Sequence, residues 1–146
     1  MDPFVSVEVE GQPQGKGRPR FSSGRTKDGV PFTRVHTPLK TQTYETVIKR
    51  AAVKAMGERD PIEGCVKVDI LCLFKVPKSW SKRDRQAALD GDIRPTGKPD
   101  WDNIAKAVCD AVRGIVWTDD ARVVDARVRK FYGKAPAVHF DVYADQ

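Results

Sequence analysis

The sequence predicts an α/β (α+β) fold, in which helices pack against a small mixed β-sheet. Three observations support this class: strand-like and helix-like segments alternate, a mostly apolar run lies between breakers near the middle, and two alternating runs close the chain. The chain has 146 residues, of which 40% are hydrophobic and 32% are charged, which suits one folded unit with a real core. We therefore expect residues 1–146 to form a single domain.

The first third of the chain predicts a strand, a basic loop region and a long helix. Residues 5–10 alternate valine with polar side chains, as a half-buried strand does. Residues 12–38 are rich in Gly, Pro, Ser and Arg, so we expect a mobile hairpin or a long loop. The pair Thr37-Pro38 then offers a helix start, and apolar residues recur at helical spacing up to Gly57.

The middle of the chain predicts a central strand and a short helix. Residues 68–76, VDILCLFKV, form an apolar run that fits a strand covered on both faces. Lys67, Asp69 and Lys75 fall on one face, so we expect the ends of that face to be exposed to solvent. Residues 79–89 suit a short helix that is capped by Ser79 or Ser81.

The last third predicts a helix and two strands. Residues 102–113 place apolar side chains on one face and end at Gly114, so we expect a helix with Asp102 as its N-cap. Residues 123–131 and 137–143 alternate as two strands around a turn at Gly133-Lys134.

Composition excludes several classes of protein. Cys65, Cys72 and Cys109 form no C-x-x-C pair, which favours buried free thiols over a disulfide or zinc framework. No run approaches the roughly 20 apolar residues that cross a membrane, and the N-terminal residues do not resemble a secretion signal. We therefore expect a cytoplasmic protein without a membrane partner or a small-molecule cofactor.

The positive charge is concentrated in one segment. The net charge is +6, and residues 16–40 alone hold seven basic residues against one acidic residue, or 7 − 1 = +6. A basic segment beside a neutral body is typical of proteins that bind a phosphate backbone, whereas a basic loop that only aids solubility is the plainer alternative. The basic residues are Lys16, Arg18, Arg20, Arg25, Lys27, Arg34 and Lys40.

Asp100, Asp102 and Asp120 stand at element boundaries, where carboxylates can be presented to solvent. Asp100 and Asp102 bracket Trp101, so we expect both carboxylates on one side and the indole turned into the core. Asp120 precedes a strand and is expected at a strand edge near the start of the helix. Three hard oxygen ligands suit Mg²⁺ or Mn²⁺ better than zinc.

Lys106 lies one helical turn after Asp102 and would stand beside such a metal. There it would bind the scissile phosphate, stabilise developing charge or orient the attacking water. The structural alternative is an exposed ladder of ion pairs through Asp102, Lys106 and Asp110, with Asp102 serving only as a helix cap.

Two linked motifs resemble the RusA-type Holliday junction resolvases, a family often encoded by prophages. They are KPDWDNIAKAVCDAV at residues 98–112 and WTDDARVVDARV at residues 117–128, and GKGRPRF at residues 15–21 looks like the opening loop of phage-type members. The resemblance implies that Asp100, Asp102 and Asp120 are metal ligands and that Lys106 is the catalytic lysine. It departs from the family pattern before the first aspartate, where only Arg94 and Lys98 are basic.

The resemblance implies a homodimer that hydrolyses phosphodiesters at four-way branched DNA with Mg²⁺. A four-way junction presents two equivalent strands, and a twofold dimer supplies two identical sites for cutting them. The DNA contacts are then expected from Lys98 and from the basic residues of segment 16–40, where Phe21 and Phe32 either wedge between bases or pack the loop. Two alternatives remain: a metal-dependent nuclease for other branched DNA, and a DNA-binding module without enzymatic activity.

Overall fold

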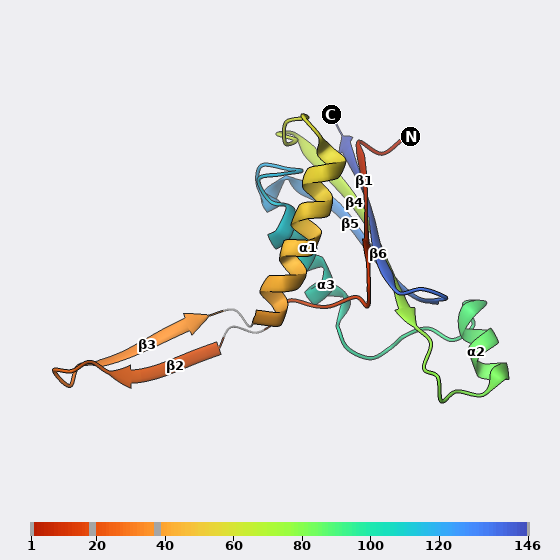
Figure 1. Cartoon of the computed structure of the whole chain (residues 1–146). Helices are drawn as coiled ribbons and strands as arrows, with labels where there is room; N and C mark the ends of the chain where they lie inside the picture. The colour runs from red at the N-terminus through yellow and green to blue at the C-terminus, as the bar shows by residue number, and fades with distance from the viewer. Residues whose placement is uncertain (1, 18–19, 37–38, 146) are drawn as a thin grey trace.

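A computed structural model describes residues 2–17, 20–36 and 39–145. Its centre is one four-stranded sheet with the order β1-β6-β4-β5, in which β4 and β5 are parallel and the other neighbours are antiparallel. The sheet is therefore mixed, as the sequence predicts (Figure 1). The bounds are β1 Val5–Glu10, β4 Cys65–Lys75, β5 Val123–Gly133 and β6 Ala137–Asp145.

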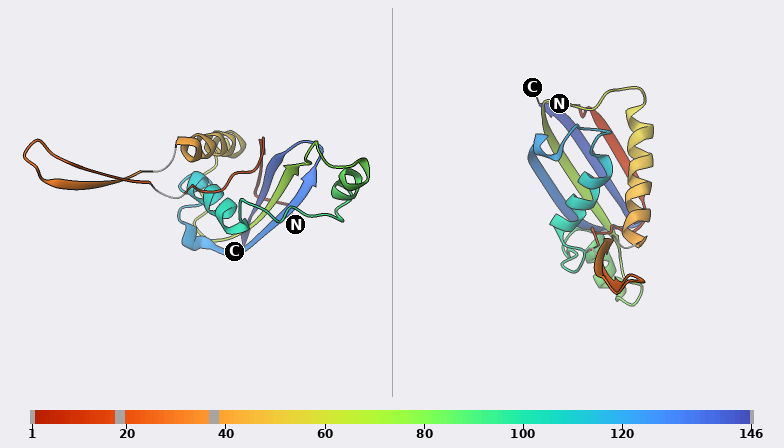
Figure 2. Two further views of the ribbon diagram at one scale, coloured as in Figure 1. Left: turned by 90° about the horizontal axis from the view of Figure 1, so that it is seen from below. Right: turned by 90° about the vertical axis from the view of Figure 1, so that its left-hand side faces the viewer.

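Two helices cover one face of this sheet. The helix α1, Leu39–Met56, packs on β1 and on α3, and α3, Trp101–Val112, also contacts β5. The short helix α2, Lys82–Leu89, lies apart from them and contacts β5 (Figure 2). This layering confirms the α+β class. The helix α3 lies between α1 and β5, the strand at one edge of the sheet.

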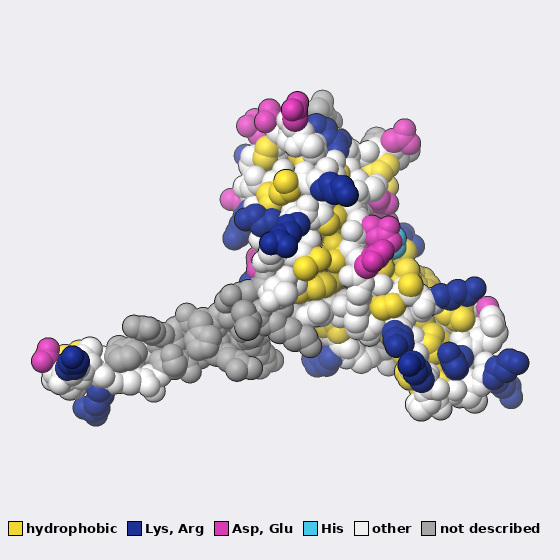
Figure 3. All heavy atoms as spheres, viewed as in Figure 1, with side chains coloured by type: hydrophobic (Ala, Val, Ile, Leu, Met, Phe, Trp, Pro, Cys, Tyr) yellow, Lys and Arg dark blue, Asp and Glu magenta, His cyan; other side chains and the backbone are white. Residues whose placement is uncertain are grey.

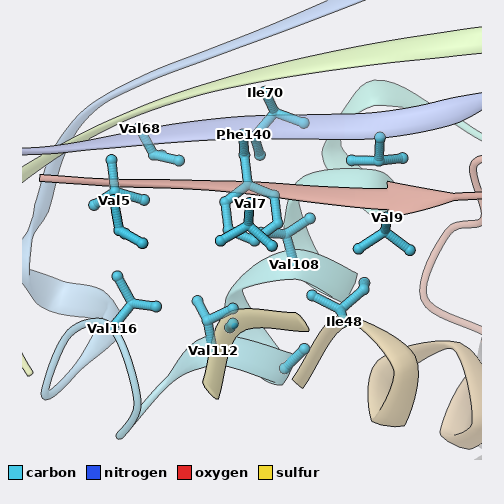
Figure 4. Packing of buried hydrophobic residues seen from close by; sticks show 14 of the residues in the cluster. Val5, Val7, Val9, Ile48, Val68, Ile70, Val108, Val112, Val116 and Phe140 are labelled. Atoms are coloured by element: carbon cyan, nitrogen blue, oxygen red, sulfur yellow. The ribbon is translucent and has the colours of Figure 1, made fainter. Parts of the chain in front are cut away.

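The core fills the space between the sheet and the two long helices. Figure 4 shows the three valines of β1 facing side chains of α1 and α3. Each is at most 4% exposed, and burying such a side chain stabilises the fold by roughly 1.5–3 kcal/mol. Opposite them lie Ile48 of α1, Val108 and Val112 of α3, and Val116.

The central strand β4 is buried on only one face. Its even-numbered residues from Val66 to Phe74 are buried, whereas Asp69, Leu71 and Leu73 on the other face are half-buried. The expectation of a strand covered on both faces is therefore wrong, because α1 and α3 lie on the same side of the sheet. The expected exposure of Lys67 and Lys75 is confirmed.

The basic segment forms a hairpin outside this sheet. The strands β2, Arg20–Arg25, and β3, Pro31–His36, pair antiparallel with each other, and the hairpin projects away from the sheet and helices (Figures 1 and 2). The hairpin prediction is thus confirmed. Thr37 and Pro38, the expected helix start, lie outside the described residues.

The helix ends follow local signals, with one exception. Ser81 is the N-cap of α2 and its hydroxyl accepts the Asp84 N–H at 3.1 Å, while Gly57 follows α1 with a φ of +61°. However, α3 begins two residues earlier than predicted, with Asp100 and not Asp102 as its N-cap. The expectation that Trp101 turns into the core is also wrong, since this residue is 63% exposed.

The cysteines differ in environment. All three are free thiols, as predicted, but only Cys72 is fully buried, while Cys109 is half-buried and Cys65 is exposed. Cys65 is the first residue of β4, where alternation turns its side chain away from the helices. Across the described residues, no helix is long and apolar enough to cross a membrane.

Candidate functional site

Asp100 and Asp102 stand at the N-terminal end of α3. Asp100 has extended backbone angles, φ −68° and ψ 153°, and its side chain makes no capping hydrogen bond to the described helix. Asp102, in the first turn, is exposed. The positive end of the helix dipole favours both carboxylates. Neither carboxylate caps the helix, and both are therefore presented to solvent at the start of α3.

Lys98 forms an ion pair with Asp100. Its Nζ lies 3.0 Å from each carboxylate oxygen of Asp100, but the two side chains are 82% and 47% exposed. An ion pair this exposed contributes at most about 1 kcal/mol and is easily exchanged for another partner. Lys98 can therefore release Asp100 to a cation or turn towards a phosphate.

Lys130 of β5 holds the loop that leads into Asp100. Its Nζ donates hydrogen bonds to the carbonyls of Gly97, at 2.7 Å, and Pro99, at 2.9 Å. The Arg94 Nε in turn donates to the Lys130 carbonyl at 2.7 Å, and its guanidinium lies 3.6 Å from the centre of the Phe131 ring. The sequence prediction did not include Lys130, because its position on a strand gave no sign of the distant loop.

The opening segment of the basic region lies against the same helix end. Gly15 approaches α3 so closely that an added Cβ would meet the Asn103 Cβ at 2.9 Å and the Pro99 Cβ at 3.0 Å. The next residue, Lys16, donates its backbone N–H to the Asn103 carbonyl at 3.0 Å. Glycine is therefore needed at this contact, which ties the base of the hairpin to the aspartate pair.

The side chain of Lys16 forms ion pairs within the protein. Its Nζ lies 2.6 Å from Glu45 of α1 and 3.1 Å from Asp110 of α3, and the side chain is only 17% exposed. Burial lowers the pKa of Lys16, but the hydrogen bonds and charges of Glu45 and Asp110 outweigh it and raise the pKa above its ordinary value. In this position Lys16 joins two helices through its ion pairs with Glu45 and Asp110.

This contact also alters the alternative interpretation of the acidic residues. Asp110 pairs with Lys16 and so is not the end of an exposed ladder that runs through Lys106. Lys106 is exposed, one turn after Asp102. The helix therefore carries Lys106 one turn beyond Asp102, and its catalytic role stays a prediction.

Asp120 lies at the other end of α3. The buried indole of Trp117 donates from Nε1 to Asp120 at 2.9 Å, and Arg113, the C-cap of α3, approaches the same carboxylate at 3.5 Å. Burial raises the pKa of the neighbouring Cys109 thiol to about 11, and the negative charges of Asp120 and Asp110 add to the shift. Asp119 has a separate role, because its carboxylate caps a one-turn 3₁₀ helix, Asp120–Arg122, by accepting the Ala121 N–H.

The three aspartates therefore do not meet within one chain. The 12 residues of α3 span about 18 Å at 1.5 Å per residue, with Asp100 at the first end and Arg113, next to Asp120, at the last. Among the residues described, no three acidic, histidine or cysteine side chains lie together as a metal site. The expectation that Asp120 lies near the start of the helix is wrong, because the chain runs the length of α3 before it reaches β5.

The predicted DNA contacts are only partly described. Arg25 and Lys27 are exposed near the turn of the hairpin. Arg18 lies outside the described residues, as do the side chains of Arg20, Arg34 and Lys40 and those of Phe21 and Phe32.

The comparisons with known proteins define the class of this domain. Residues 10–143, which include the hairpin, the aspartates and all of α2 and α3, match the family described as Endodeoxyribonuclease RusA. The protein is therefore a nuclease, of the class that cuts DNA strands internally. The chain belongs to the RusA endodeoxyribonuclease family. It is also 36% identical over 136 residues to the uncharacterized protein YqaN of Bacillus subtilis strain 168, and the match covers 92% of each chain.

Proposed function

We propose that this nuclease resolves Holliday junctions, by cutting two equivalent strands of four-way branched DNA in a reaction that depends on Mg²⁺ or Mn²⁺. The observation that carries the proposal is the exposed pair Asp100 and Asp102 at the start of a helix, beside Lys106, in a chain of this nuclease family. The hairpin emerges next to this pair and carries the positive charge that a DNA backbone attracts.

The chemistry of the residues fits a hard divalent cation. Mg²⁺ binds carboxylate oxygens through one or two aspartates and keeps several water molecules, and the Asp100 carboxylate is not engaged in capping. A bound Mg²⁺ would activate water and neutralise charge on the scissile phosphate. Asp100 and Asp102 would hold it, and the Lys106 ammonium would bind the same phosphate and stabilise its developing charge.

A second copy of the chain would complete the site with its own Asp120. Support comes from the separation of Asp120 from the aspartate pair along α3. Support also comes from β5, an edge strand whose residues 124–127, close to Asp120, are all exposed. An open edge of this kind offers unpaired backbone groups and an exposed Val124 to a partner. A twofold dimer would then carry two equivalent composite sites, as two symmetric cuts require.

A panel of synthetic DNA substrates tests the function. Purified protein is incubated with a mobile four-way junction, a flap, a nicked duplex and a linear duplex, each with and without Mg²⁺. We expect symmetric cuts in the junction, only with metal. Equal cutting of the flap or the nicked duplex would favour a general branched-DNA nuclease, and binding without cutting would favour a non-enzymatic module.

A further inference from the structure

Six exposed cations gather around α2, far along the chain from the hairpin. Figure 3 shows this concentration of Lys and Arg side chains on and beside α2. None of the six forms an ion pair with a described residue, whereas Lys16, Lys98, Arg113 and Arg129 are all paired. We call this set the α2 basic surface: Lys75, Lys78, Lys82, Arg83, Arg85 and Lys134.

Four of these cations line one hollow. It has a volume of about 210 Å³ between the end of β4, α2 and the turn from β5 to β6, and no carboxylate is among the residues that line it. Its lining consists of Lys75, Lys78, Arg85 and Lys134, together with Val76 and Leu89. Like charges this close repel one another, and an anion in or over the hollow would relieve the repulsion.

The acids of the same region leave a clear excess of positive charge. Residues 75–92 contain five basic and three acidic residues, and with Lys134 the balance is 6 − 3 = +3. Of the acids, Asp90 already accepts a hydrogen bond from Gln86 at 2.9 Å. Glu8 and Glu10 line a neighbouring hollow with Lys134 but form no ion pair with it, and Glu8 lies 3.6 Å from His139. The five cations of residues 75–92 therefore remain available to an external partner.

The α2 basic surface lies at the same end of the sheet as Asp100. Lys130 of β5 holds the loop before Asp100, and β5 ends three residues later at Gly133, directly before Lys134. The base of the hairpin contacts the start of α3 through Lys16 and Asn103. Figure 1 shows the hairpin and α2 on opposite sides of this helix start, so the aspartate pair lies between two basic regions.

We propose that the α2 basic surface binds the phosphate backbone of a duplex arm other than the arm that the hairpin contacts. The inference rests on the proposed function, because only branched DNA has separate arms on the two sides of one cutting site. Duplex DNA carries one negative charge per about 1.7 Å of axis, so it can meet several spaced cations at once. A small anion would occupy the hollow alone and leave Lys82 and Arg83 without a partner.

A matched pair of charge variants tests the surface. One combines Lys78→Gln, Arg85→Gln and Lys134→Gln, and the control combines Lys49→Gln, Arg50→Gln and Lys54→Gln on the exposed side of α1. Both variants remove three positive charges from surface positions. Affinity for a four-way junction is measured against salt concentration without divalent metal. We expect the first variant to flatten the log–log slope by about 0.9 for each phosphate that it no longer binds, and the control to keep the wild-type slope.

Changing the DNA substrate distinguishes a failure of this inference from a failure of the proposed function. Shortening one pair of junction arms should weaken binding by wild-type protein, but it should not weaken binding by the first variant further. If the two variants gave equal slopes of log affinity against log salt concentration, whether changed or unchanged from wild type, the inference would be overturned. Cutting of the junction is measured separately. A flattened slope in a protein that binds linear duplex as well as junction would keep the surface as a DNA contact and reject the resolvase function.

Discussion

The indole nitrogen of Trp117 donates a hydrogen bond of 2.9 Å to the carboxylate of Asp120. Trp117 is completely buried, so its bond fixes Asp120 beyond the end of α3, away from Asp100 and Asp102. A carboxylate that is held by a buried donor is preorganised for one direction of binding. In the proposed dimer that direction is towards the aspartate pair of the second copy.

Replacing any one of the proposed metal ligands should abolish cutting. For Asp100→Asn, Asp102→Asn and Asp120→Asn we expect a loss greater than the roughly 10- to 100-fold that is usual for residues that only orient a ligand. Junction binding should stay intact or become tighter, because each change removes a negative charge that repels phosphate. Cleavage rates in Mg²⁺ and affinities without metal measure the two effects separately.

The neighbouring Asp119 provides the control for these variants. Its carboxylate caps the Ala121 N–H at 3.0 Å, and asparagine caps nearly as well, so Asp119→Asn should keep most of the activity. A variant at Asp100, Asp102 or Asp120 that cuts at the wild-type rate would remove that residue from the set of ligands.

Mixing two inactive variants tests whether the metal site is shared between chains. In a dimer of one Asp102→Asn chain and one Asp120→Asn chain, one composite site keeps all three aspartates, because its pair and its Asp120 come from the unaltered positions of different chains. Mixing and refolding the two proteins should therefore restore nicking of a junction to a substantial fraction of the wild-type rate per site.

A second mixture is the matched control. Asp100→Asn and Asp102→Asn damage the pair in both chains, so their mixed dimers should stay inactive. If the mixture of Asp102→Asn with Asp120→Asn also stays inactive although mixed dimers form, the shared site is wrong and each chain must assemble its own.

Lys130 is expected to act as a positioning residue for Asp100. Lys130→Met removes the donors to the carbonyls of Gly97 and Pro99 but keeps an unbranched apolar stem near Phe74. We expect the Mg²⁺ concentration for half-maximal cutting to rise by roughly 10- to 100-fold, with junction binding in the absence of metal unchanged. Lys130→Arg should recover part of the loss.

Lys67 offers a comparison on the same sheet. It lies over the Tyr143 ring and donates no hydrogen bond to the loop, so Lys67→Met should leave the Mg²⁺ dependence as it is. An unchanged Mg²⁺ dependence in Lys130→Met would mean that the loop keeps Asp100 in place without this clamp.

Lys16 should matter for stability and not for DNA affinity. Lys16→Met leaves Glu45 and Asp110 without their shared cation and should lower the free energy of unfolding by about 1–3 kcal/mol near neutral pH, measured by urea titration. The exposed Lys49→Met should change it by less than about 0.5 kcal/mol. If Lys16→Met instead lowered DNA affinity and left stability unchanged, Lys16 would be a DNA-binding residue.

The same ion pair predicts a pH dependence. The pKa of Lys16 is raised in the folded protein, so its contribution is fully present below the ordinary value of 10.5 and is lost as the pH rises through the folded-state pKa. The difference between wild type and Lys16→Met should therefore shrink well above pH 10.5. A difference that stays constant there would mean that packing, and not charge, makes the contact.

The elements with strong periodicity could be predicted from the sequence. The alternating valines of β1 and the apolar face of α3 each have only one compatible burial pattern, and both are confirmed. The start of α3 could not be fixed in the same way, because Asp100 and Asp102 are equally good N-cap residues. The exposure of Trp101 follows from that shift, since it places this residue in the first turn and outside the buried stripe.

The geometry of the site depends on contacts between residues that are far apart in the sequence. Motif spacing identified Asp100, Asp102 and Asp120, but it could not show that β5 runs parallel to β4, which places Asp120 at the far end of α3. The clamp of Lys130 on Gly97 joins residues 33 positions apart and has no local signal. The half-buried ion pairs of Lys16 with Glu45 and Asp110 could not be predicted either, because net charge alone does not distinguish a paired cation from a free one.

Paired cutting of a cruciform is the most direct measurement of junction resolution. A supercoiled plasmid that extrudes a four-way cruciform is incubated with the protein and Mg²⁺, and the first product is identified on a gel. Two cooperating sites in one bound dimer should give linear plasmid directly, and mixed dimers with one Asp102→Asn chain should shift the product to nicked circles. If the wild-type protein gives only nicked circles, or cuts a plasmid without the cruciform equally well, the resolvase function is contradicted.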